Sequence, residues 1–535
     1  MDAKPIMLQG TASNVGKSIL TAALCRIFLQ DGYRTAPFKA QNMALNSAVT
    51  PDGGEIGRAQ AVQAEAAGIQ ATVEMNPILI KPKQDMHAQI VVLGRPYSDM
   101  SAKDYRSQFL PQIHNVVEDC IQKLKSEFDV LVIEGAGSPA EVNLKDRDIV
   151  NMKTAEMADS PVILVADIDR GGVFAAIIGT LELLEQHERE RVKGFIINKF
   201  RGDLDLLQPG LQFLEQRTGI EVLGVIPYIH DHGIEEEDSV WLSEINREGR
   251  IGDKHAAITV AVIQLPRISN FTDFMPFFGL PDVAVQFVKA GQSIGDVDLI
   301  ILPGTKNTVL DMAYLWEQGY GEEIQAHVRR GKRLVGICGG YQMLGEELHD
   351  PCDCESDSGK RQPGLGLFSF TTEFHPKKHT YQVEARLSGH YGFWQQLQGE
   401  VIRGYEIHTG ECTRNDKSQN GESQNGKTRN DKLDSAQCHS LLTIEKRSGK
   451  SVSVDDGLCG YAGRVFGTHV HGFFDNPQVL QAFINDIRRE KSLPELEMSQ
   501  LGIVEKNSRF DHLADIVRRS LDMEKVYQIM GIQDR

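Results

Sequence analysis

The chain has 535 residues, which is too many for one hydrophobic core, so we expect two or three domains. Apolar residues make up 41% and charged residues 24%, a composition typical of folded globular domains. The net charge of −17 argues against a nucleic-acid binder or a binder of anionic membranes, because such proteins need a basic surface.

The first ten residues lack the charged and apolar regions of a signal peptide. No apolar run approaches the roughly 20 residues that span a bilayer, so we expect no membrane association. Eight cysteines are scattered along the chain without the spacing of a disulfide framework. A reducing, cytoplasmic location fits this usage best.

Short apolar runs alternate with helical patterns over residues 1–235. Several runs are continuous Val, Ile and Leu, as expected of parallel strands that are buried on both faces. Alternation of this kind predicts an α/β fold, here a doubly wound domain. The expected strands are residues 5–10, 33–40, 129–137, 161–167, 192–199 and 222–228.

Residues 236–255 turn acidic and lose strand character, so we expect a linker. A second α/β series follows at 256–480, with β-rich sequence in its later part. Within it, residues 413–437 are polar and self-similar, which predicts a mobile insertion. Residues 481–535 have helical spacing and are expected to form a C-terminal tail that serves packing rather than chemistry.

The stretch GTASNVGKS, from Gly10 to Ser18, follows an apolar strand and enters a helix. Backbone N–H groups and the helix dipole can hold phosphates in that setting. Gly10 and Gly16 would shape the loop, Lys17 would neutralise phosphate charge, and Ser18 would offer a hydroxyl to Mg²⁺. The loop has one residue more than the usual spacing, which leaves a plain glycine-rich turn as the alternative.

Other strand ends support a nucleotide site. Glu134 ends a buried strand, where Mg²⁺ is the natural partner for its carboxylate, unless it caps the next helix. Glu55 is a second Mg²⁺ candidate, with a helix-dipole role as its competitor. Lys39 would steady a transferring phosphoryl group or be solvated. Asn198 would read adenine or lie in an ordinary turn.

The stretch KRLVGICGGYQMLG has the form of a nucleophile elbow. An apolar strand stops at Cys338, and paired glycines then permit a tight turn into a helix. Such a turn exposes the thiol and directs N–H groups of the helix at it. Gly339 would supply one oxyanion N–H and Gly304, in another strand-end turn, the second. A buried structural cysteine is the alternative.

A thiolate needs a base. His469 and His471 are two residues apart on an expected strand, where we expect them to point to opposite faces, so that only one of them can meet Cys338. We expect one of them to do so, and the other to be an ordinary core or edge histidine. Glu406 and His408 in GYEIHTG are further candidates.

These motifs resemble known families. GTASNVGKS is similar to the lengthened phosphate loop of the dethiobiotin-synthetase-like ATPases, and the Cys338 elbow to that of class I glutamine amidotransferases. No H-x-E follows either histidine, so the usual carboxylate partner is absent. That departure, and the ending GTHVHGFF, resemble the cobyric/cobyrinic acid synthase branch, in which His471 aligns with the catalytic histidine. Met275 stands where that branch would have an acidic residue.

The resemblance covers residues 5–480 and implies an ATP-, Mg²⁺- and glutamine-dependent amidation. It implies acyl phosphates on the b, d, e and g carboxylates of adenosylcobyrinic acid a,c-diamide, displaced by ammonia to give adenosylcobyric acid. The corrinoid polycarboxylate would meet local cations, for which the candidates are Lys81, Lys83, Arg170 and Arg201.

Two alternatives remain from the sequence, and the oligomeric state is open. One is the sister activity that makes the a,c-diamide from cobyrinic acid. The other is a partner-binding P-loop ATPase that carries an inactive glutaminase-like module. Such ATPases carry an extra lysine near the start of the loop, and Gln9 followed by Gly10 does not supply it.

Overall fold

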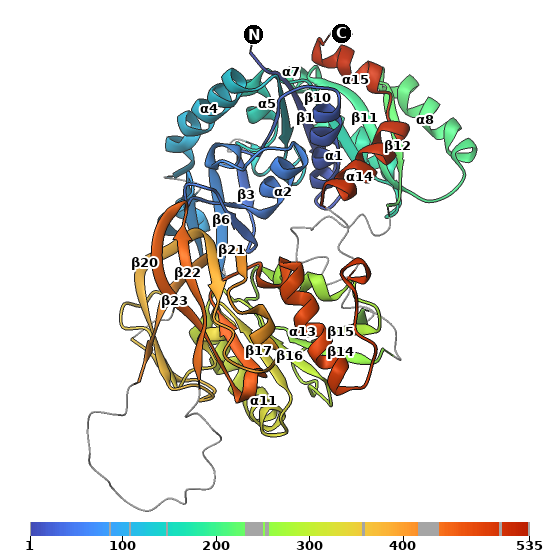
Figure 1. The fold of residues 1–535 in the computed structure, drawn as a ribbon. Helices are drawn as coiled ribbons and strands as arrows, with labels where there is room; N and C mark the ends of the chain where they lie inside the picture. The colour runs from blue at the N-terminus through green and yellow to red at the C-terminus, as the bar shows by residue number, and fades with distance from the viewer. Residues whose placement is uncertain are drawn as a thin grey trace, which may run out of the picture. The chain divides into compact units, whose positions relative to one another are not determined.

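A computed structural model describes residues 2–84, 87–105, 109–145, 148–229, 250–251, 256–355, 359–415, 438–501 and 506–532. The chain divides into unit 1, residues 1–50, 54–237 and 504–535, and unit 2, residues 51–53 and 238–503 (Figure 1). Each unit has its own main sheet and apolar core. Most of the linker expected at 236–255 lies outside the described residues, as do residues 416–437 of the insertion expected at 413–437.

The main sheet of unit 1 has six strands in the order β12-β11-β10-β1-β9-β2. All five strand pairs are parallel. This arrangement confirms the α/β prediction, and every expected strand of the first half appears. The strands are β1 (Lys4–Gly10), β2 (Thr35–Phe38), β9 (Val130–Glu134), β10 (Val162–Asp167), β11 (Val192–Phe200) and β12 (Val222–Pro227).

Both faces of this sheet are buried. Successive residues of a strand point to opposite faces, and here they belong to two different apolar clusters. Met7 lies in one cluster, whereas Ile6 and Leu8 lie in the other. The helices of unit 1 are α1 (Lys17–Gln30), α2 (Arg58–Ala66), α3 (Ala102–Asp104), α4 (Leu110–Glu127), α5 (Met152–Ala158), α6 (Val173–Leu183), α7 (Gln186–Arg189), α8 (Leu204–Thr218), α14 (Lys506–Ser520) and α15 (Met523–Met530).

Two small sheets complete unit 1 beside the carboxyl end of β2. A four-stranded sheet has the order β3-β6-β7-β8 and a two-stranded hairpin pairs β4 with β5. These strands are β3 (Gln41–Met43), β4 (Ser47–Val49), β5 (Glu55–Gly57), β6 (Ile78–Gln84), β7 (His87–Val92) and β8 (Arg95–Ser101).

Unit 2 contains a sheet that is parallel in its first part and mostly antiparallel in its second, where β18 and β20 are the parallel pair. The parallel part runs β15-β14-β16-β17-β24, with strands β14 (Ile258–Ile263), β15 (Val283–Val288), β16 (Leu299–Leu302), β17 (Arg333–Ile337) and β24 (Val465–Thr468). The sheet then continues through β23 (Lys450–Gly460), β22 (His439–Arg447), β20 (Phe370–Leu387), β18 (Glu347–His349) and β19 (Arg361–Pro363), with β21 (Val401–Arg414) paired to β20 and β13 (Arg250–Ile251) to β15.

In the described part of unit 2, the helices that accompany this sheet are α10 (Thr308–Glu317), α11 (Tyr320–Arg329), α12 (Gly339–Gln342) and α13 (Pro477–Glu490). The short α12 follows β17 directly, so the end of β17 and the start of a helix meet at one residue, Cys338. Among the helices that the structure describes, none has the length and apolar character needed to cross a membrane.

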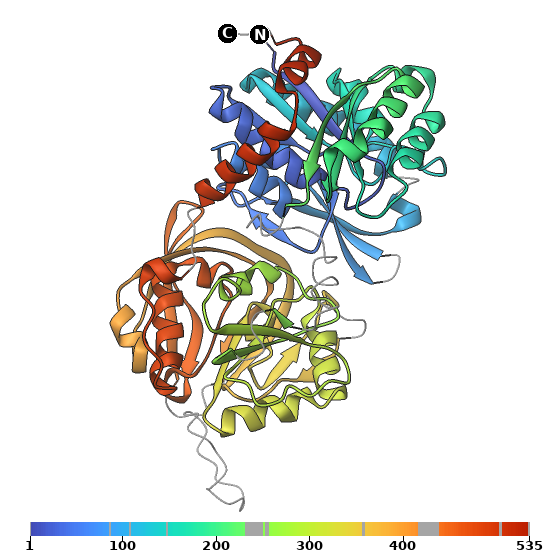
Figure 2. The same cartoon turned by 90° about the vertical axis from the view of Figure 1, so that its right-hand side faces the viewer.

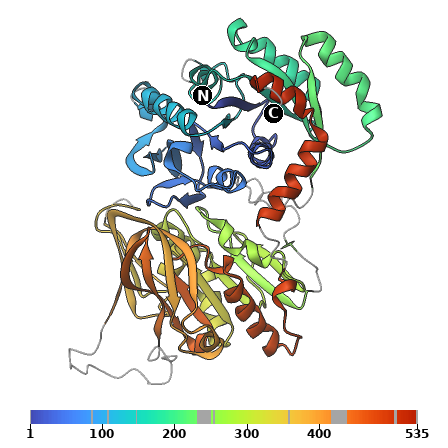
Figure 3. The same ribbon diagram turned by 45° about the horizontal axis from the view of Figure 1, so that its top comes forward.

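The segment 481–535, expected to be one tail, is divided between the units. Helix α13 belongs to unit 2, whereas α14 and α15 belong to unit 1. Arg26 of α1 pairs with Asp511 of α14 at 2.7 Å, and Arg518 pairs with Asp31 at 2.9 Å. Figures 2 and 3 show these C-terminal helices (red) against the side of unit 1 that carries α1 (dark blue). The end of the chain therefore packs on the helix that follows the phosphate-type loop.

Candidate active sites

The loop between β1 and α1 has a backbone that only particular residues accept. Gly16 precedes α1 with φ of 96°, and Asn14 has φ of 61°. A Cβ at Gly16 would lie 2.1 Å from the Asn198 side-chain nitrogen, so both conformation and space require glycine there. A Cβ at Gly10 would lie 2.7 Å from the Ala12 carbonyl oxygen. The loop is thus a tightly folded turn at the N-terminus of a 14-residue helix.

The Lys17 ammonium is held over this loop. Its Nζ donates to the carbonyl oxygens of Ala12 and Gly137, each at 3.1 Å, and the side chain is buried. Gly137 follows β9, so the lysine bridges the loop and the carboxyl end of the next strand in the sheet. A buried cation beside helix N–H groups is an arrangement that suits a phosphate.

Glu134 is the centre of a polar cluster at the end of β9. It accepts hydrogen bonds from Ser18 Oγ at 2.8 Å, Lys39 Nζ at 2.8 Å and Gln63 Nε2 at 2.5 Å. Burial alone would raise the pKa of Glu134, but the Lys39 charge and these hydrogen bonds outweigh it, so the pKa lies below its ordinary value. The carboxylate is therefore ionised at neutral pH.

The cluster suits a hard divalent cation. The Ser18 hydroxyl and the Glu134 carboxylate offer two oxygens at one point beside the loop, and Mg²⁺ prefers oxygen ligands with one or two of them from protein. Among the described residues, no group of three or more His, Cys, Asp or Glu side chains is arranged to hold a metal by itself. A metal at this point would thus need oxygens from a bound phosphate as well.

Glu55 has its contacts in another place. It pairs with Lys81, which also donates to Ser47 Oγ at 2.8 Å, and both charged side chains are buried. The structure places Glu55 on β5 of the small sheets, and its role as a Mg²⁺ ligand stays a prediction. Lys81, a candidate corrinoid contact, is the buried partner of Glu55, and that contact likewise stays a prediction.

The other three cations proposed to contact a substrate have different settings. Arg170 lies 3.7 Å from Asp167, and Arg201 pairs with Asp169 at 3.1 Å and stacks over Tyr228. The side chains of Arg170 and Arg201 are 59% and 50% exposed. The side chain of Lys83 lies outside the described residues.

Asn198 supports the loop. Its Nδ2 donates to the Val15 carbonyl oxygen at 2.8 Å, and the next residue, Lys199, donates to the Asn14 carbonyl oxygen at 2.7 Å. Both residues end β11, so this strand fixes the backbone of the phosphate-type loop. This bracing contact was not predicted from the sequence, and reading of adenine by Asn198 stays a prediction.

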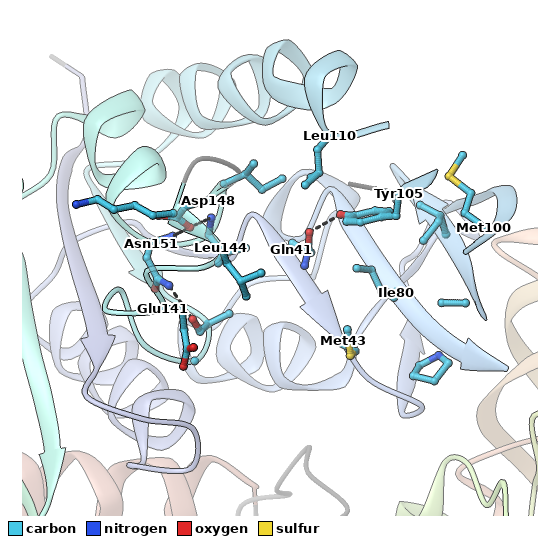
Figure 4. A pocket seen from close by; sticks show the side chains of 18 of the residues that line it. Gln41, Met43, Ile80, Met100, Tyr105, Leu110, Glu141, Leu144, Asp148 and Asn151 are labelled. Atoms are coloured by element: carbon cyan, nitrogen blue, oxygen red, sulfur yellow. Dashed lines mark hydrogen bonds between the residues drawn. The ribbon is translucent and has the colours of Figure 1, made fainter. Parts of the chain in front are cut away.

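A cavity of about 580 Å³ opens beside this cluster (Figure 4). Part of its wall is formed by Ala136, Gly137 and Ser138, which follow Glu134 closely in the chain. The carbonyl oxygen of Gly137 is the one that accepts from Lys17. Apolar side chains from the four-stranded sheet form much of the remaining wall, with Tyr105 hydrogen-bonded to Gln41 inside it. Its size is that of a small-molecule site. The cavity therefore offers space for an acceptor next to the phosphate-type loop.

In unit 2, Cys338 sits at a strained turn. Its φ of 52° and ψ of −110° lie far from the helical and strand regions, and α12 begins at the next residue. A Cβ at Gly340 would lie 2.0 Å from the Leu302 carbonyl oxygen, so this turn needs glycine. The predicted elbow is present, with a thiol at the N-terminus of a helix.

The loop after β16 lies against this turn. A Cβ at Gly339 would lie 2.7 Å from the Thr305 side chain, and a Cβ at Gly304 would lie 3.2 Å from His471 Cε1. Gly304, Gly339 and His471 are thus gathered around Cys338. The two oxyanion N–H groups assigned to Gly304 and Gly339 stay predictions.

His471 is the histidine that meets Cys338. Its Nδ1 lies 2.7 Å from Asp273 Oδ2, and the other Asp273 oxygen accepts from the Gly472 N–H at 2.8 Å. Burial alone would lower the pKa of His471, but the Asp273 charge, the Cys338 charge and hydrogen bonds to both raise it to about 10. A thiol, an imidazole and a carboxylate therefore form one buried chain.

This geometry corrects the expectation that the histidine lacks a carboxylate partner. Asp273 lies in a short 3₁₀ helix, η4 (Phe271–Phe277), 198 residues before His471. The same stretch, NFTDFMPFF, contains Met275, where the sequence suggested a missing acid. The acid is present two residues earlier.

His469 makes separate contacts. Its Nδ1 lies 2.7 Å from Asp456 Oδ1, and its Nε2 faces Gln342 at 3.3 Å. Of the further candidates, Glu406 accepts a two-pronged pair of bonds from Arg447, at 2.7 and 2.8 Å, and His408 stacks on His469. None of these residues replaces His471 beside Cys338.

Sequence reasoning missed two residues that the structure brings to these sites, Asp273 and Gln63. Asp273 is the single acidic residue of the stretch NFTDFMPFF. A lone acid among aromatic residues could have indicated a functional carboxylate. Gln63 lies in the helical run EIGRAQAVQAEAAG, where nothing distinguishes it from Gln60.

Comparison with known proteins assigns both halves to families. The CobQ/CobB/MinD/ParA nucleotide binding domain matches residues 6–238, and the CobB/CobQ-like glutamine amidotransferase domain matches residues 259–479. Three relatives match nearly the whole chain, and each is a cobyric acid synthase. That of Desulforamulus reducens is 55% identical, with 99% of this chain and 98% of the relative covered. Those of Moorella thermoacetica and Salmonella typhimurium are each 48% identical, with 99% and 98% of this chain and 98% of each relative covered.

Proposed function

Since the chain belongs to the cobyric acid synthase family, whose members carry out glutamine-dependent amidation in cobalamin biosynthesis, we propose that it amidates the b, d, e and g carboxylates of adenosylcobyrinic acid a,c-diamide. Unit 1 uses ATP to convert each carboxylate into an acyl phosphate. Unit 2 hydrolyses glutamine and supplies the ammonia that displaces phosphate. The product is adenosylcobyric acid, and the expected location is the cytoplasm.

In unit 1, the β- and γ-phosphates of ATP lie on the loop from Gly10 to Gly16, and Lys17 contacts their oxygens. This role is supported by the position of Lys17, which already bridges the loop and Gly137. Ser18 and Glu134 would hold Mg²⁺, which supplies charge neutralisation between the phosphates. Lys39, bonded to Glu134 at 2.8 Å, stands beside the transferring phosphoryl group.

The cavity beside Gly137 receives the substrate carboxylate. Because its wall is formed largely by apolar side chains, it suits the edge of a corrinoid macrocycle that carries one carboxylate towards Lys17. Placing the carboxylate next to the γ-phosphate accounts for most of the rate enhancement, because phosphoryl transfer depends on positioning and charge stabilisation more than on covalent catalysis by the protein.

In unit 2, the Cys338 thiolate attacks the side-chain amide of glutamine. His471 holds a proton between the thiolate and Asp273 and gives it to the leaving ammonia. Asp273 fixes the imidazole ring and stabilises its charge, as the carboxylate of a triad does. The N–H groups of Gly339 and Gly304 stabilise the oxyanion, and water then releases glutamate from the thioester with His471 as base.

One observation carries this proposal: a single chain holds both a buried Lys17–Ser18–Glu134 phosphate-type site and an intact Cys338–His471–Asp273 chain. An inactive glutaminase-like module would not need the strained backbone at Cys338 or the buried Asp273–His471 pair. The partner-binding ATPase alternative is therefore disfavoured.

Mass spectrometry of the corrinoid tests the proposal. The protein is incubated with ATP, Mg²⁺ and glutamine, and with either cobyrinic acid or its a,c-diamide. We expect four successive amidations of the diamide and stoichiometric ADP release. Preferential turnover of cobyrinic acid, ending at two amidations, would instead assign the sister activity.

A further inference from the structure

Unit 2 contains a second chain of thiol, imidazole and carboxylate besides the one at Cys338. Cys412 Sγ lies 3.8 Å from His469 Nε2, and His469 Nδ1 lies 2.7 Å from Asp456 Oδ1. The three residues come from three strands or their ends, β21, β24 and β23. Cys412 also lies within hydrogen-bonding distance of Thr372, at 3.3 Å. The proposed activity uses none of these side chains.

The carboxylate of this cluster is firmly held. Asp456 accepts hydrogen bonds from the Thr468 hydroxyl at 2.5 Å and from the His469 N–H at 3.0 Å, besides its contact with the ring. Burial alone would raise the pKa of Asp456, but the charge and hydrogen bond of His469 lower it to about 2. Asp456 is therefore ionised over the whole physiological range.

The imidazole is correspondingly cationic. Burial alone would lower the pKa of His469, but the charges of Asp456 and Cys412 and hydrogen bonds to both raise it well above its ordinary value. His408 stacks on the ring at 4.0 Å and stays neutral, since burial and the His469 charge lower its pKa to about 4. Tyr341 packs edge-on and Gln342 faces Nε2, so both of these neighbours are neutral. Cys412 is thus the thiol that faces the His469 cation.

The backbone conformation at Cys412 distinguishes this site from a glutaminase centre such as the one at Cys338. Cys412 pairs with Thr372 in the β20–β21 ladder, whereas Cys338 lies at a strained turn before a helix. No helix N-terminus follows Cys412, because β21 continues to Arg414. The thiol therefore lacks the N–H groups that would stabilise an oxyanion. It is also partly accessible, whereas Cys338 is buried.

We propose that Cys412 is a second activated thiol, a modification site that hydrogen peroxide oxidises to sulfenic acid. A cationic imidazole that faces a thiol stabilises the thiolate, the form that reacts. The thiolate attacks one peroxide oxygen, an S–O bond forms and the O–O bond breaks. Sulfur loses two electrons to the peroxide, and the leaving hydroxide takes a proton from His469 to become water.

The chain offers an internal reference for this proposal. Cys352 is exposed, whereas Cys412 is only partly so. If exposure alone set thiol reactivity, Cys352 would react faster. If the imidazole sets it, Cys412 reacts faster despite its lower exposure.

The experiment uses the full chain with Cys338→Ser, which removes the other thiol that faces a histidine. Iodoacetamide alkylation is followed by mass spectrometry of the peptides that carry Cys412 and Cys352. We expect Cys412 to react faster, and His469→Gln to slow it roughly tenfold or more relative to Cys352. His471→Gln is the matched control, because it removes a neighbouring imidazole that faces Cys338, and it should leave the Cys412 rate unchanged.

Asp456→Asn provides a second variant should His469→Gln fold poorly, which alkylation of Cys459, a buried thiol of unit 2, would reveal. It should also slow the alkylation of Cys412, because the imidazole of His469 loses the carboxylate charge of Asp456 that keeps it cationic. Treatment with hydrogen peroxide and dimedone should place the sulfenic acid adduct on Cys412 ahead of Cys352. Slower reaction of Cys412 than of Cys352, or equal slowing by His469→Gln and His471→Gln, would overturn the proposal.

Discussion

The two active sites hold their charges in different ways. In unit 1, Lys39 and Glu134 lie at two strand ends and pair with each other, whereas Lys17 lies at the start of α1 and donates to two backbone carbonyls. In unit 2, Cys338, His471 and Asp273 form a linear chain, and the strain is concentrated at one residue. In the proposed reaction, unit 1 activates the carboxylate whichever nitrogen source is used, whereas unit 2 only releases ammonia from glutamine. Damage to unit 1 should therefore stop amidation from any nitrogen source, and damage to unit 2 should stop only the use of glutamine.

Cys338→Ser should give the largest effect. Glutamine-dependent amidation should fall about 10⁵-fold, because the nucleophile of the linear chain is lost. Amidation with added ammonium salts should persist at the wild-type rate, as measured by ADP release and corrinoid mass. Loss of both activities would contradict the separation of the two sites.

Asp273→Asn should disrupt the same series of side chains at its carboxylate end. Glutamine use should fall about 10⁴-fold, because an amide no longer stabilises the charged imidazole or fixes its tautomer. Asp456→Asn is the matched control, as the same change beside His469, and it should leave the glutaminase rate within a few-fold. Glutamate release measures both variants, and equal loss in the two would show that Asp273 acts only through folding.

Lys17→Ala should lower amidation about 10³-fold with glutamine and with ammonium alike, because the phosphates lose their buried cation. Hydrolysis of glutamine by Cys338, measured as glutamate release, should continue. Turnover that is retained with ammonium would show that the loop is not catalytic. This result, set beside that of Cys338→Ser, gives the sharpest contrast between the two sites.

The smallest effect concerns stability and pH. The pKa of His471 is raised from 6.5 to about 10 in the folded chain, so its ion pair stabilises unit 2 fully below pH 6.5 and loses this contribution as the pH rises through 10. The difference in free energy of unfolding between the wild type and His471→Gln should be on the order of a few kcal/mol at pH 6. It should shrink steadily towards pH 10.

Urea titrations that are followed by tryptophan fluorescence can measure this difference. The chain has three tryptophans, of which Trp316 and Trp394 lie in unit 2 and Trp241 lies outside the described residues. The described tryptophans therefore report on unit 2. A difference that grows with pH would show that His471 is neutral in the folded chain.

The sequence predicted those parts of the molecule whose signals are local. Strands of continuous Val, Ile and Leu, the loop from Gly10 to Ser18 and the elbow at Cys338 are each contained in one short stretch. Their outcome follows from backbone sterics and burial, which act over a few residues. The choice between His469 and His471 rested on the branch resemblance, which indicated His471.

Long-range pairings were the part that the sequence did not predict. Asp273 meets His471 across 198 residues, whereas the expectation of an absent carboxylate rested only on the residues just after each histidine. Lys81 was predicted only as a possible corrinoid contact, and its burial against Glu55 was not predicted. The expectation that His469 and His471 point to opposite faces of a strand was wrong, because residues two apart share a face in a regular strand. In addition, β24 ends at Thr468, before both histidines.

The return of the C-terminus to unit 1 has a consequence for synthesis on the ribosome. Leu513, Ala514 and Val517 of α14 are fully buried in the same apolar cluster as Leu20 and Leu24 of α1. The nucleotide-binding half is thus translated first, yet its core is completed only when the last residues emerge, after the glutaminase half has been made. Until α14 has been synthesised, the apolar face of α1 that packs against it is exposed. We therefore expect the glutaminase half to complete its fold before the nucleotide-binding half, although it is translated later.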